Sequence, residues 1–256
     1  MGNDRFDVSD RVIVITGAGQ GLGREYALAF AAEGAMPVLA EVNGENVRSV
    51  AAEIEAAGGT ALAVETDVGD PDSVDAMVAA ALDAYGRIDV LINNAAIFAT
   101  LPQRPFYDIP FEEWNKVMHV NITGSYLCAS AVAKPMMAAS QGRIINVSSG
   151  TVPQGAPGFM HYVTSKSAII GMTRVMAREL SDHNINVNTL MPGYTTTEVE
   201  HASMDDDLHE FIQSKRLVKR AGTPDDLIGA AMFLASPASS FISGQTLAVC
   251  GGEVMI

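Results

Sequence analysis

A chain of 256 residues that is 48% hydrophobic and only 18% charged can bury the core of one large α/β domain. Its net charge of −14 argues against binding to a nucleic-acid backbone, and its two cysteines, Cys128 and Cys250, do not have the spacing of a disulfide framework or a zinc site. The five histidines show no metal-ligand spacing, the N-terminus does not resemble a signal peptide, and no apolar run is long enough to span a membrane. We therefore expect a cytoplasmic protein with a small ligand, no metal and no nucleic-acid or membrane partner.

Short apolar runs alternate with helical segments along the chain. Strands are predicted at 12–16, 36–40, 61–65, 88–93, 143–147, 185–190 and 246–249. Helices are predicted at 24–33, 45–57, 71–85, 111–139 (with a bend), 160–181 and 224–234, and the acidic stretch 197–213 is expected to be mostly helical. This order predicts a Rossmann-like doubly wound parallel sheet of about seven strands with helices on both faces. No linker divides it, so we expect a single domain, 1–256, with a small substrate lid at about 195–220.

The first predicted strand runs directly into a glycine-rich turn, residues 16–23. Its glycines follow the pattern G-x-x-x-G-x-G from Gly17 to Gly23, with Gly21 between them. Glycines at this point let the backbone turn tightly and approach a pyrophosphate, which then lies at a helix N-terminus. A merely tight loop would have the same composition, but the position between a strand and a helix favours a dinucleotide-binding turn.

An acidic residue, Glu41, follows the second predicted strand. A carboxylate at this place can accept hydrogen bonds from the adenosine ribose hydroxyls and repels a 2′-phosphate. The neighbouring Gln20 and Val42 offer no positive charge. The sequence therefore favours NAD over NADP, although a solvated loop carboxylate would look the same.

Tyr162 and Lys166 stand four residues apart, which places them on one face of a helix. An ammonium within about 4 Å favours a phenolate by up to roughly 4 kcal/mol, enough to lower a tyrosine pKa by about two to three. That shift would suit acid–base chemistry. Tyr-x-x-x-Lys also arises by chance on solvated helices, so the pair needs support from the rest of the chain.

Taken together, these residues resemble the pattern of classical short-chain dehydrogenases/reductases over essentially the whole chain. The matching segments are the turn at 16–23, Asp67-Val68, Asn93-Asn94-Ala95, Asn121, Ser149, Tyr162, Lys166, Pro192-Gly193 and the tail from Gly244 to Gly252. Two positions depart from the family pattern. Ala96 replaces the glycine of Asn-Asn-Ala-Gly, and Cys250 replaces the aspartate of Val-Asp-Gly-Gly.

The resemblance implies a catalytic role for four side chains. Tyr162 would be the general base in oxidation and the acid in reduction, and Lys166 would lower its pKa and hold the nicotinamide ribose. Ser149, with Ser148 as the nearest rival, would hydrogen-bond the substrate oxygen. Asn121 would hold a water in a proton relay to Lys166.

The same resemblance implies a set of cofactor-binding positions. They are Gly17, Gln20, Gly21, Leu22, Gly23, Glu41, Asp67, Val68, Asn93, Ala95, Tyr162, Lys166, Pro192, Gly193, Thr195 and Thr197. Within this set, Asp67 and Val68 would meet the adenine and Asn93 and Ala95 the adenosine-side ribose. Thr195 and Thr197 would touch the carboxamide and phosphates.

Candidate substrate-lining positions are largely apolar or aromatic. They are Ala96, Phe98, Thr151, Pro153, Phe159 and Tyr194, with the segment 199–212. No arginine or lysine is expected near Ser149 or Tyr162, so we expect an uncharged, fairly hydrophobic secondary alcohol or ketone. His161 is expected to be a packing residue, and 205–207 a solvated lid surface.

Other functions and the assembly remain open at this stage. An alternative enzyme is a 3-oxoacyl thioester (acyl-carrier-protein) reductase, for which the only basic cluster is Lys215, Arg216, Lys219 and Arg220. A non-catalytic dinucleotide-binding scaffold is a second alternative, which the presence of all four catalytic side chains disfavours. The helices at 111–139 and 160–181 are apolar nearly all round, which suggests burial against another subunit. The resemblance implies a homotetramer, or a dimer.

Overall fold

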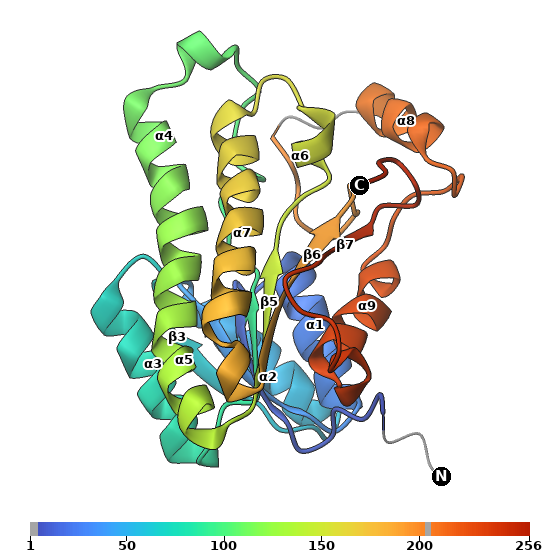
Figure 1. The fold of residues 1–256 in the computed structure, drawn as a ribbon. Coiled ribbons are helices and arrows are strands. Elements are labelled where there is room, and N and C mark those ends of the chain that lie inside the picture. The colour runs from blue at the N-terminus through green and yellow to red at the C-terminus, as the bar shows by residue number, and fades with distance from the viewer. Residues whose placement is uncertain (1–4, 203–205) are drawn as a thin grey trace.

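The computed structural model describes residues 5–202 and 206–256. Seven strands form one parallel sheet in the order β3-β2-β1-β4-β5-β6-β7 (Figure 1). Their bounds are β1 Val12–Thr16, β2 Met36–Glu41, β3 Leu62–Glu65, β4 Val90–Asn93, β5 Gly142–Val147, β6 Ile185–Pro192 and β7 Thr246–Val249. The predicted Rossmann-like sheet with helices around it is confirmed.

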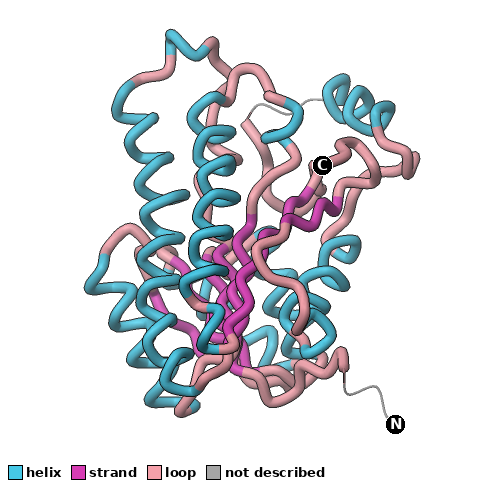
Figure 2. Tube along the Cα trace, in the orientation of Figure 1, coloured by secondary structure: helices cyan, strands magenta, loops and turns pink. Residues whose placement is uncertain are grey.

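Helices cover both faces of this sheet (Figure 2). They are α1 Gly21–Ala32, α2 Gly44–Ala56, α3 Pro71–Tyr85, α4 Phe111–Met118, α5 Ser125–Ala139, α6 Thr151–Gln154, α7 Met160–Glu179, α8 Asp206–Lys215 and α9 Asp225–Ala235. Successive side chains of a strand point to opposite faces, so Ile13 and Ile15 pack with α1, α2 and α9. Val12 and Val14 pack with α3, α5 and α7. The fold therefore has one core on each face of the sheet.

The chain reverses direction across the sheet between β1 and β4, and Thr16 joins the two strands there. Its buried hydroxyl oxygen accepts hydrogen bonds from the backbone N–H groups of Asn94 and Ala95, both at 3.0 Å. The Asn94 side chain donates back to the Thr16 carbonyl at 3.0 Å. Ligands of open α/β sheets bind in the crevice at such a switch point, at the carboxyl ends of the strands.

The predicted long helix at 111–139 is two helices joined by a π-helical turn, His119–Gly124. The turn provides the bend that the sequence predicts, and it carries Asn121 into the interior. Gly124 lets this turn lie close to the segment that follows β3, because a Cβ at this position would be 2.7 Å from a Val68 methyl group. π-Turns of this kind occur frequently at functional sites.

Element ends differ from the predictions where tertiary contacts decide them. The first helix begins at Gly21 instead of residue 24, inside the glycine turn. Pro37 is the second residue of β2, before β3 begins to pair, so its missing N–H leaves no gap in the sheet. The acidic stretch 197–213 is helical only from Asp206, in α8. The expected solvated surface at 205–207 includes a residue outside the described ones.

Asp89 ties the amino-terminal edge of the sheet together. It is 1% exposed, and its carboxylate accepts a hydrogen bond from the Val12 N–H at 2.9 Å. The same carboxylate accepts from Gln141 at 3.1 Å and pairs with the Arg87 guanidinium. It thereby connects the start of β1 with the segments that enter β4 and β5.

We expect Asp89→Ala to lower the free energy of unfolding by about 3 kcal/mol, because it leaves buried donors and a cation without their partner. Urea titration followed by circular dichroism measures this loss. Asp83→Ala, on the exposed side of α3, is the control and should change stability by less than about 0.5 kcal/mol. Equal stabilities of the two variants would contradict the role given to Asp89.

Candidate active site

A cleft of about 1110 Å³ opens at the carboxyl ends of the strands. Most of the predicted site residues line it. Those that do are Gly17, Gln20, Gly21, Leu22, Glu41, Asp67, Val68, Ala95, Ala96, Phe98, Ser149, Thr151, Phe159, Tyr162, Lys166, Pro192, Gly193, Tyr194, Thr195 and Thr197, with Val199, His201, Phe211 and Ile212 of the segment 199–212. Residues separated by nearly the whole chain therefore meet in one cavity.

One wall of the cleft carries Tyr162 and Lys166 on the first turns of α7, with Ser149 after β5. All three side chains are buried. The Lys166 ammonium lies 5.8 Å from the centre of the Tyr162 ring and donates to the Val147 carbonyl at 2.8 Å. Ser148, the rival of Ser149, also lines the cleft, but its hydroxyl donates to the Lys166 carbonyl at 2.8 Å. The arrangement therefore presents Ser149, and not Ser148, beside the phenol.

Burial dominates the protonation of this pair. It raises the pKa of Tyr162 to about 12, although the hydrogen bond with the Ser149 side chain acts in the lowering direction. Burial also lowers the pKa of Lys166 to about 8. The pKa of the phenol is thus raised, and not lowered, by its surroundings in this structure, and the ammonium donates to a backbone carbonyl.

Asn121 lies behind this wall, fully buried. Its side-chain oxygen accepts from the Ile97 N–H at 2.8 Å, and its nitrogen donates to the Ser165 hydroxyl at 3.0 Å. Ser165 lies one residue before Lys166 on α7. Asn121 does not line the cleft, and it connects the π-helical turn, the segment after β4 and α7.

Aromatic rings cover the outer side of Tyr162. The Phe98 ring stacks on the Tyr162 ring with centres 4.2 Å apart and an interplanar angle of 25°. Phe159 lies 5.5 Å from Phe98, and the His201 ring meets Phe98 edge-on at 5.3 Å. Tyr194 contacts His201 at 5.9 Å. The cavity in front of the phenol is thus walled by flat, mainly apolar surfaces.

The other half of the cleft is built by the glycine turn. Gly17 lies so close to the segment after β4 that a Cβ would be 2.9 Å from the Ala95 Cα, and a Cβ at Gly23 would collide with the Gly17 carbonyl. The first two residues of α1, Gly21 and Leu22, line the cleft, and the first N–H groups of a helix have no partner within it. The Glu198 carboxylate accepts a hydrogen bond from the Gly21 N–H at 2.8 Å. A protein anion therefore already uses this helix N-terminus, which fits the phosphates of a dinucleotide.

Glu41 is the last residue of β2 and lines the cleft beside the glycine turn. One carboxylate oxygen accepts from the Gly19 N–H at 3.3 Å and the other from the Asn43 N–H at 3.1 Å. The exposed Val42 follows it. The carboxylate is thereby held toward the glycine turn.

Three predicted site residues besides Asn121 lie outside the cleft. Gly23 packs beneath the turn. The Asn93 side chain is buried in the sheet, where it donates to the Asn146 side chain at 2.9 Å and to the Ser125 carbonyl at 3.1 Å. The expected ribose contact therefore cannot come from the Asn93 side chain, and the adjacent Asn94 lines the cleft. Pro153 differs from the prediction, because it lines a different cavity.

Sequence reasoning missed a polar corner of the cleft. Glu253 lines it from the C-terminal segment, accepting from Gln154 at 2.7 Å and pairing with the buried Arg216 at 3.5 Å. Lys215 also lines the cleft, with its ammonium 5.0 Å from the centre of the Phe211 ring. Lys116 lines the cleft as well, so basic side chains other than Lys166 are present in its walls. No local sequence signal marks Glu253, since a distant chain segment brings it here.

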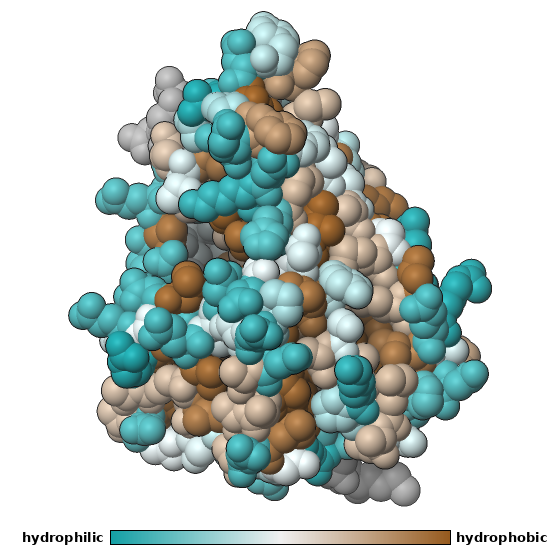
Figure 3. Space-filling model, turned by 90° about the vertical axis from the view of Figure 1, so that its left-hand side faces the viewer, coloured by the Kyte–Doolittle hydropathy of each residue, from teal (hydrophilic) through white to brown (hydrophobic). Residues whose placement is uncertain are grey.

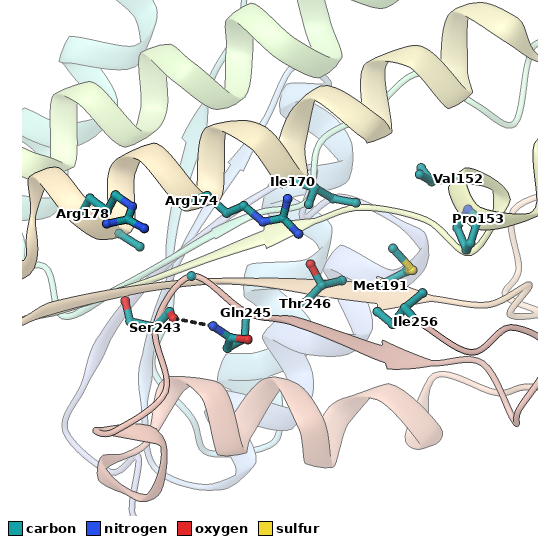
Figure 4. Close-up of a pocket in the computed structure, with 12 residues that line it drawn as sticks. Val152, Pro153, Ile170, Arg174, Arg178, Met191, Ser243, Gln245, Thr246 and Ile256 are labelled. Atoms are coloured by element: carbon teal, nitrogen blue, oxygen red, sulfur yellow. Dashed lines mark hydrogen bonds between the residues drawn. The ribbon is translucent and has the colours of Figure 1, made fainter.

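A second cleft, of about 750 Å³, lies between α7 and the β6–β7 end of the sheet (Figure 4). Arg174 and Arg178 extend over it from α7, and Gln245 and Thr246 lie on the opposite side. Pro153 and Val152 close one end. None of the four predicted catalytic residues lines this cleft, so it is distinct from the site of Tyr162.

Other kinds of site find no support in the described part of the chain. Among residues 5–202 and 206–256, no group of three or more acidic, histidine or cysteine side chains could hold a metal ion. No helix of that part is long and apolar enough to cross a membrane. Cys128 and Cys250 are both buried free thiols.

Comparison with known proteins gives the same family over nearly the whole chain. A family model described as enoyl-(acyl carrier protein) reductase matches residues 17–253. The 3-oxoacyl-[acyl-carrier-protein] reductase of Synechocystis sp. is 38% identical over 248 residues, which cover 96% of this chain and 97% of that protein.

Two solved structures are similar in fold and sequence. A 7α-hydroxysteroid dehydrogenase complexed with NADH and 7-oxo glycochenodeoxycholic acid has a TM-score of 0.93 and 30% identity, over 100% of this chain and 99% of its own. A gluconate 5-dehydrogenase from Burkholderia cenocepacia, in complex with NADP and tartrate, has a TM-score of 0.92 and 34% identity, over 98% of this chain and 97% of its own. With the glycine turn, the Tyr162–Lys166 pair and the seven-stranded sheet, these matches show that the chain belongs to the classical short-chain dehydrogenase/reductase family.

Proposed function

We propose that this protein transfers a hydride between NAD(H) and an uncharged, largely hydrophobic secondary alcohol or ketone. The observation that carries the proposal is the wall formed by Ser149, Tyr162 and Lys166, which faces the same cavity as the glycine turn. The nicotinamide would supply the redox step, and the protein would supply orientation and a proton donor or acceptor.

In this proposal Tyr162 exchanges the proton of the reacting oxygen. Its raised pKa keeps it protonated near neutral pH, which suits it as the acid in ketone reduction. Ser149 positions the same oxygen. Lys166, whose pKa is lowered by burial to about 8, holds the nicotinamide ribose and completes the proton path with the buried Asn121 behind it.

The preference for NAD rests on charge at the adenosine end of the cleft. The Glu41 carboxylate, held by Gly19 and Asn43, would meet the ribose hydroxyls there and would repel a 2′-phosphate. One similar protein was solved with NADH and another with NADP, so the preference is proposed from Glu41 alone.

The substrate class is proposed from the aromatic walls. Phe98, Phe159, Tyr194 and His201 surround the space in front of Tyr162, and flat apolar walls favour a ring or a bulky hydrocarbon. Glu253 and Gln154 add a polar corner, which would accept or donate to one hydroxyl of the substrate. The region 195–220 would act as the lid of a single 1–256 domain.

A 3-oxoacyl thioester reductase is the second candidate, favoured by the name of the Synechocystis relative. An acyl-carrier partner would require a basic patch at the entrance. Two of the four basic residues expected to form it are engaged: Arg216 is buried against Glu253, and Arg220 is paired with Asp226. The cluster offers little free charge, which makes this candidate the weaker one.

We also propose a homotetramer. Much of the apolar surplus on the two long helices lies within the chain's own core, since Val117, Val132, Met136 and Ile169 are buried. Large apolar side chains still remain exposed, among them Phe111, Tyr126 and Val175. Brown patches lie between polar groups on the face of α3, α4 and α5 (Figure 3). Such patches suit a subunit interface.

Tyr162→Phe should lower turnover by about 10²–10⁴ because it removes the proton donor. NAD affinity, measured by calorimetry, should stay within about threefold of wild type, a difference of about 0.7 kcal/mol. Turnover within about tenfold of wild type would contradict the role of this hydroxyl.

Glu41→Ala should weaken NAD binding and raise the relative affinity for NADP, with a change of about tenfold or more in the ratio of the two dissociation constants. Calorimetry with both cofactors measures the ratio. Glu45→Ala, an exposed carboxylate on α2, is the matched control and should leave it unchanged. An unchanged ratio in the Glu41 variant would refute the assignment.

Light scattering after size exclusion should give four times the chain mass of 27.0 kDa. The reason is the apolar surface left exposed on the long helices. Twice the chain mass would reduce the assembly to a dimer, and a monomer would remove the proposal of a subunit interface.

A further inference from the structure

Residues 195–202, here called the strap, run along the cleft, pass over the glycine turn and reach the segment that carries Phe98. At one end the Thr196 N–H donates to the Gly222 carbonyl at 3.0 Å, and at the other the Ala202 N–H donates to the Ala99 carbonyl at 2.8 Å. Between these anchors a Val199 methyl group lies 3.3 Å from where a Cβ of Gly21 would be. The strap therefore lies directly on the turn that would receive the dinucleotide.

Glu198 makes the polar contact between the strap and this turn. Its carboxylate accepts from the Gly21 N–H at 2.8 Å, at the first residue of α1. Hydrogen bonds from backbone N–H groups to ionised acceptors are short and strong, and the helix dipole adds to this one. The pyrophosphate of a dinucleotide lies at this same helix N-terminus in this type of fold.

The cation that Glu198 acts on most directly is already paired. Arg24, the basic residue whose pKa Glu198 helps to raise, already pairs with Glu25 and Glu53 at 2.6 Å each. A pyrophosphate approaching Gly21 would meet the Glu198 carboxylate at hydrogen-bond distance from the same N–H. Two like charges there repel each other, so one of them must leave.

We propose that Glu198 is an internal competitor for the pyrophosphate, so that cofactor binding must displace this carboxylate from the Gly21 N–H. The exposed Glu198 side chain can turn away while Thr195 and Thr197 keep their places in the cleft, and it thereby sets the affinity for phosphate-bearing ligands. This inference rests on the proposed dinucleotide-dependent function. It concerns only binding and not the chemical step.

The test is calorimetric titration of the full chain with NAD, ADP and adenosine. Glu198→Gln removes the charge and keeps an acceptor, and Glu198→Ala removes the competitor altogether. Glu200→Gln, an exposed carboxylate on the same strap, is the matched control. We expect NAD and ADP to bind about tenfold more tightly to Glu198→Ala than to the wild type, an effect of about 1.4 kcal/mol. Glu198→Gln should also bind them more tightly than the wild type, but with a smaller gain. Adenosine, which has no phosphate, should bind equally to all variants.

Unchanged or weaker ADP binding to both Glu198 variants would overturn the proposal, as would an equal gain for adenosine. An equal gain in ADP affinity for Glu200→Gln would mean that any loss of negative charge has the same effect, and it would also overturn the proposal. Failure of the proposed function looks different, because then neither NAD nor ADP binds to the wild type or to any variant. Circular dichroism of each variant verifies that the exposed substitutions leave the fold unchanged.

Discussion

Removal of Tyr162 and Lys166 from water is the constraint on which the site depends. Burial holds the phenol protonated and brings the ammonium toward neutrality, so the two groups are tuned by desolvation more than by each other. That burial requires α7 to pack its first turns against β5 and the π-helical turn. Asn121 secures this packing through Ser165 and the Ile97 backbone.

Negative charge organises the opposite half of the cleft. Glu41 and Glu198 accept hydrogen bonds from two N–H groups of the glycine turn, Gly19 and Gly21. Both carboxylates lie where a dinucleotide would bring hydroxyls or phosphates. In the proposed account one carboxylate selects the cofactor and the other must be displaced by it. One half of the cleft thus holds the buried Tyr162–Lys166 pair, and the other half, at the glycine turn, carries two carboxylates.

Most of the site was predictable because its residues follow local rules. A glycine turn after a strand and a helical Tyr-x-x-x-Lys carry their own geometry. The predictions failed where a shift of one residue along the chain decides whether a side chain faces the cleft. In α6, Thr151 and Gln154 share the face toward the cleft, so the intervening Pro153 points to the second cavity. Asn93 lies within β4 and Asn94 beyond it, so only the latter reaches the cleft. Glu253 arrives through tertiary packing, which no local pattern encodes.

The most direct test of the account is a panel of secondary alcohols and ketones, polar and hydrophobic, each with NAD(H) and NADP(H), followed by nicotinamide absorbance. We expect hydride transfer with cyclic or aromatic secondary alcohols or their ketones, and faster turnover with NAD(H). Transfer only to small polar or charged substrates would contradict the proposed substrate class. No absorbance change with any pair would contradict the proposed oxidoreductase function itself.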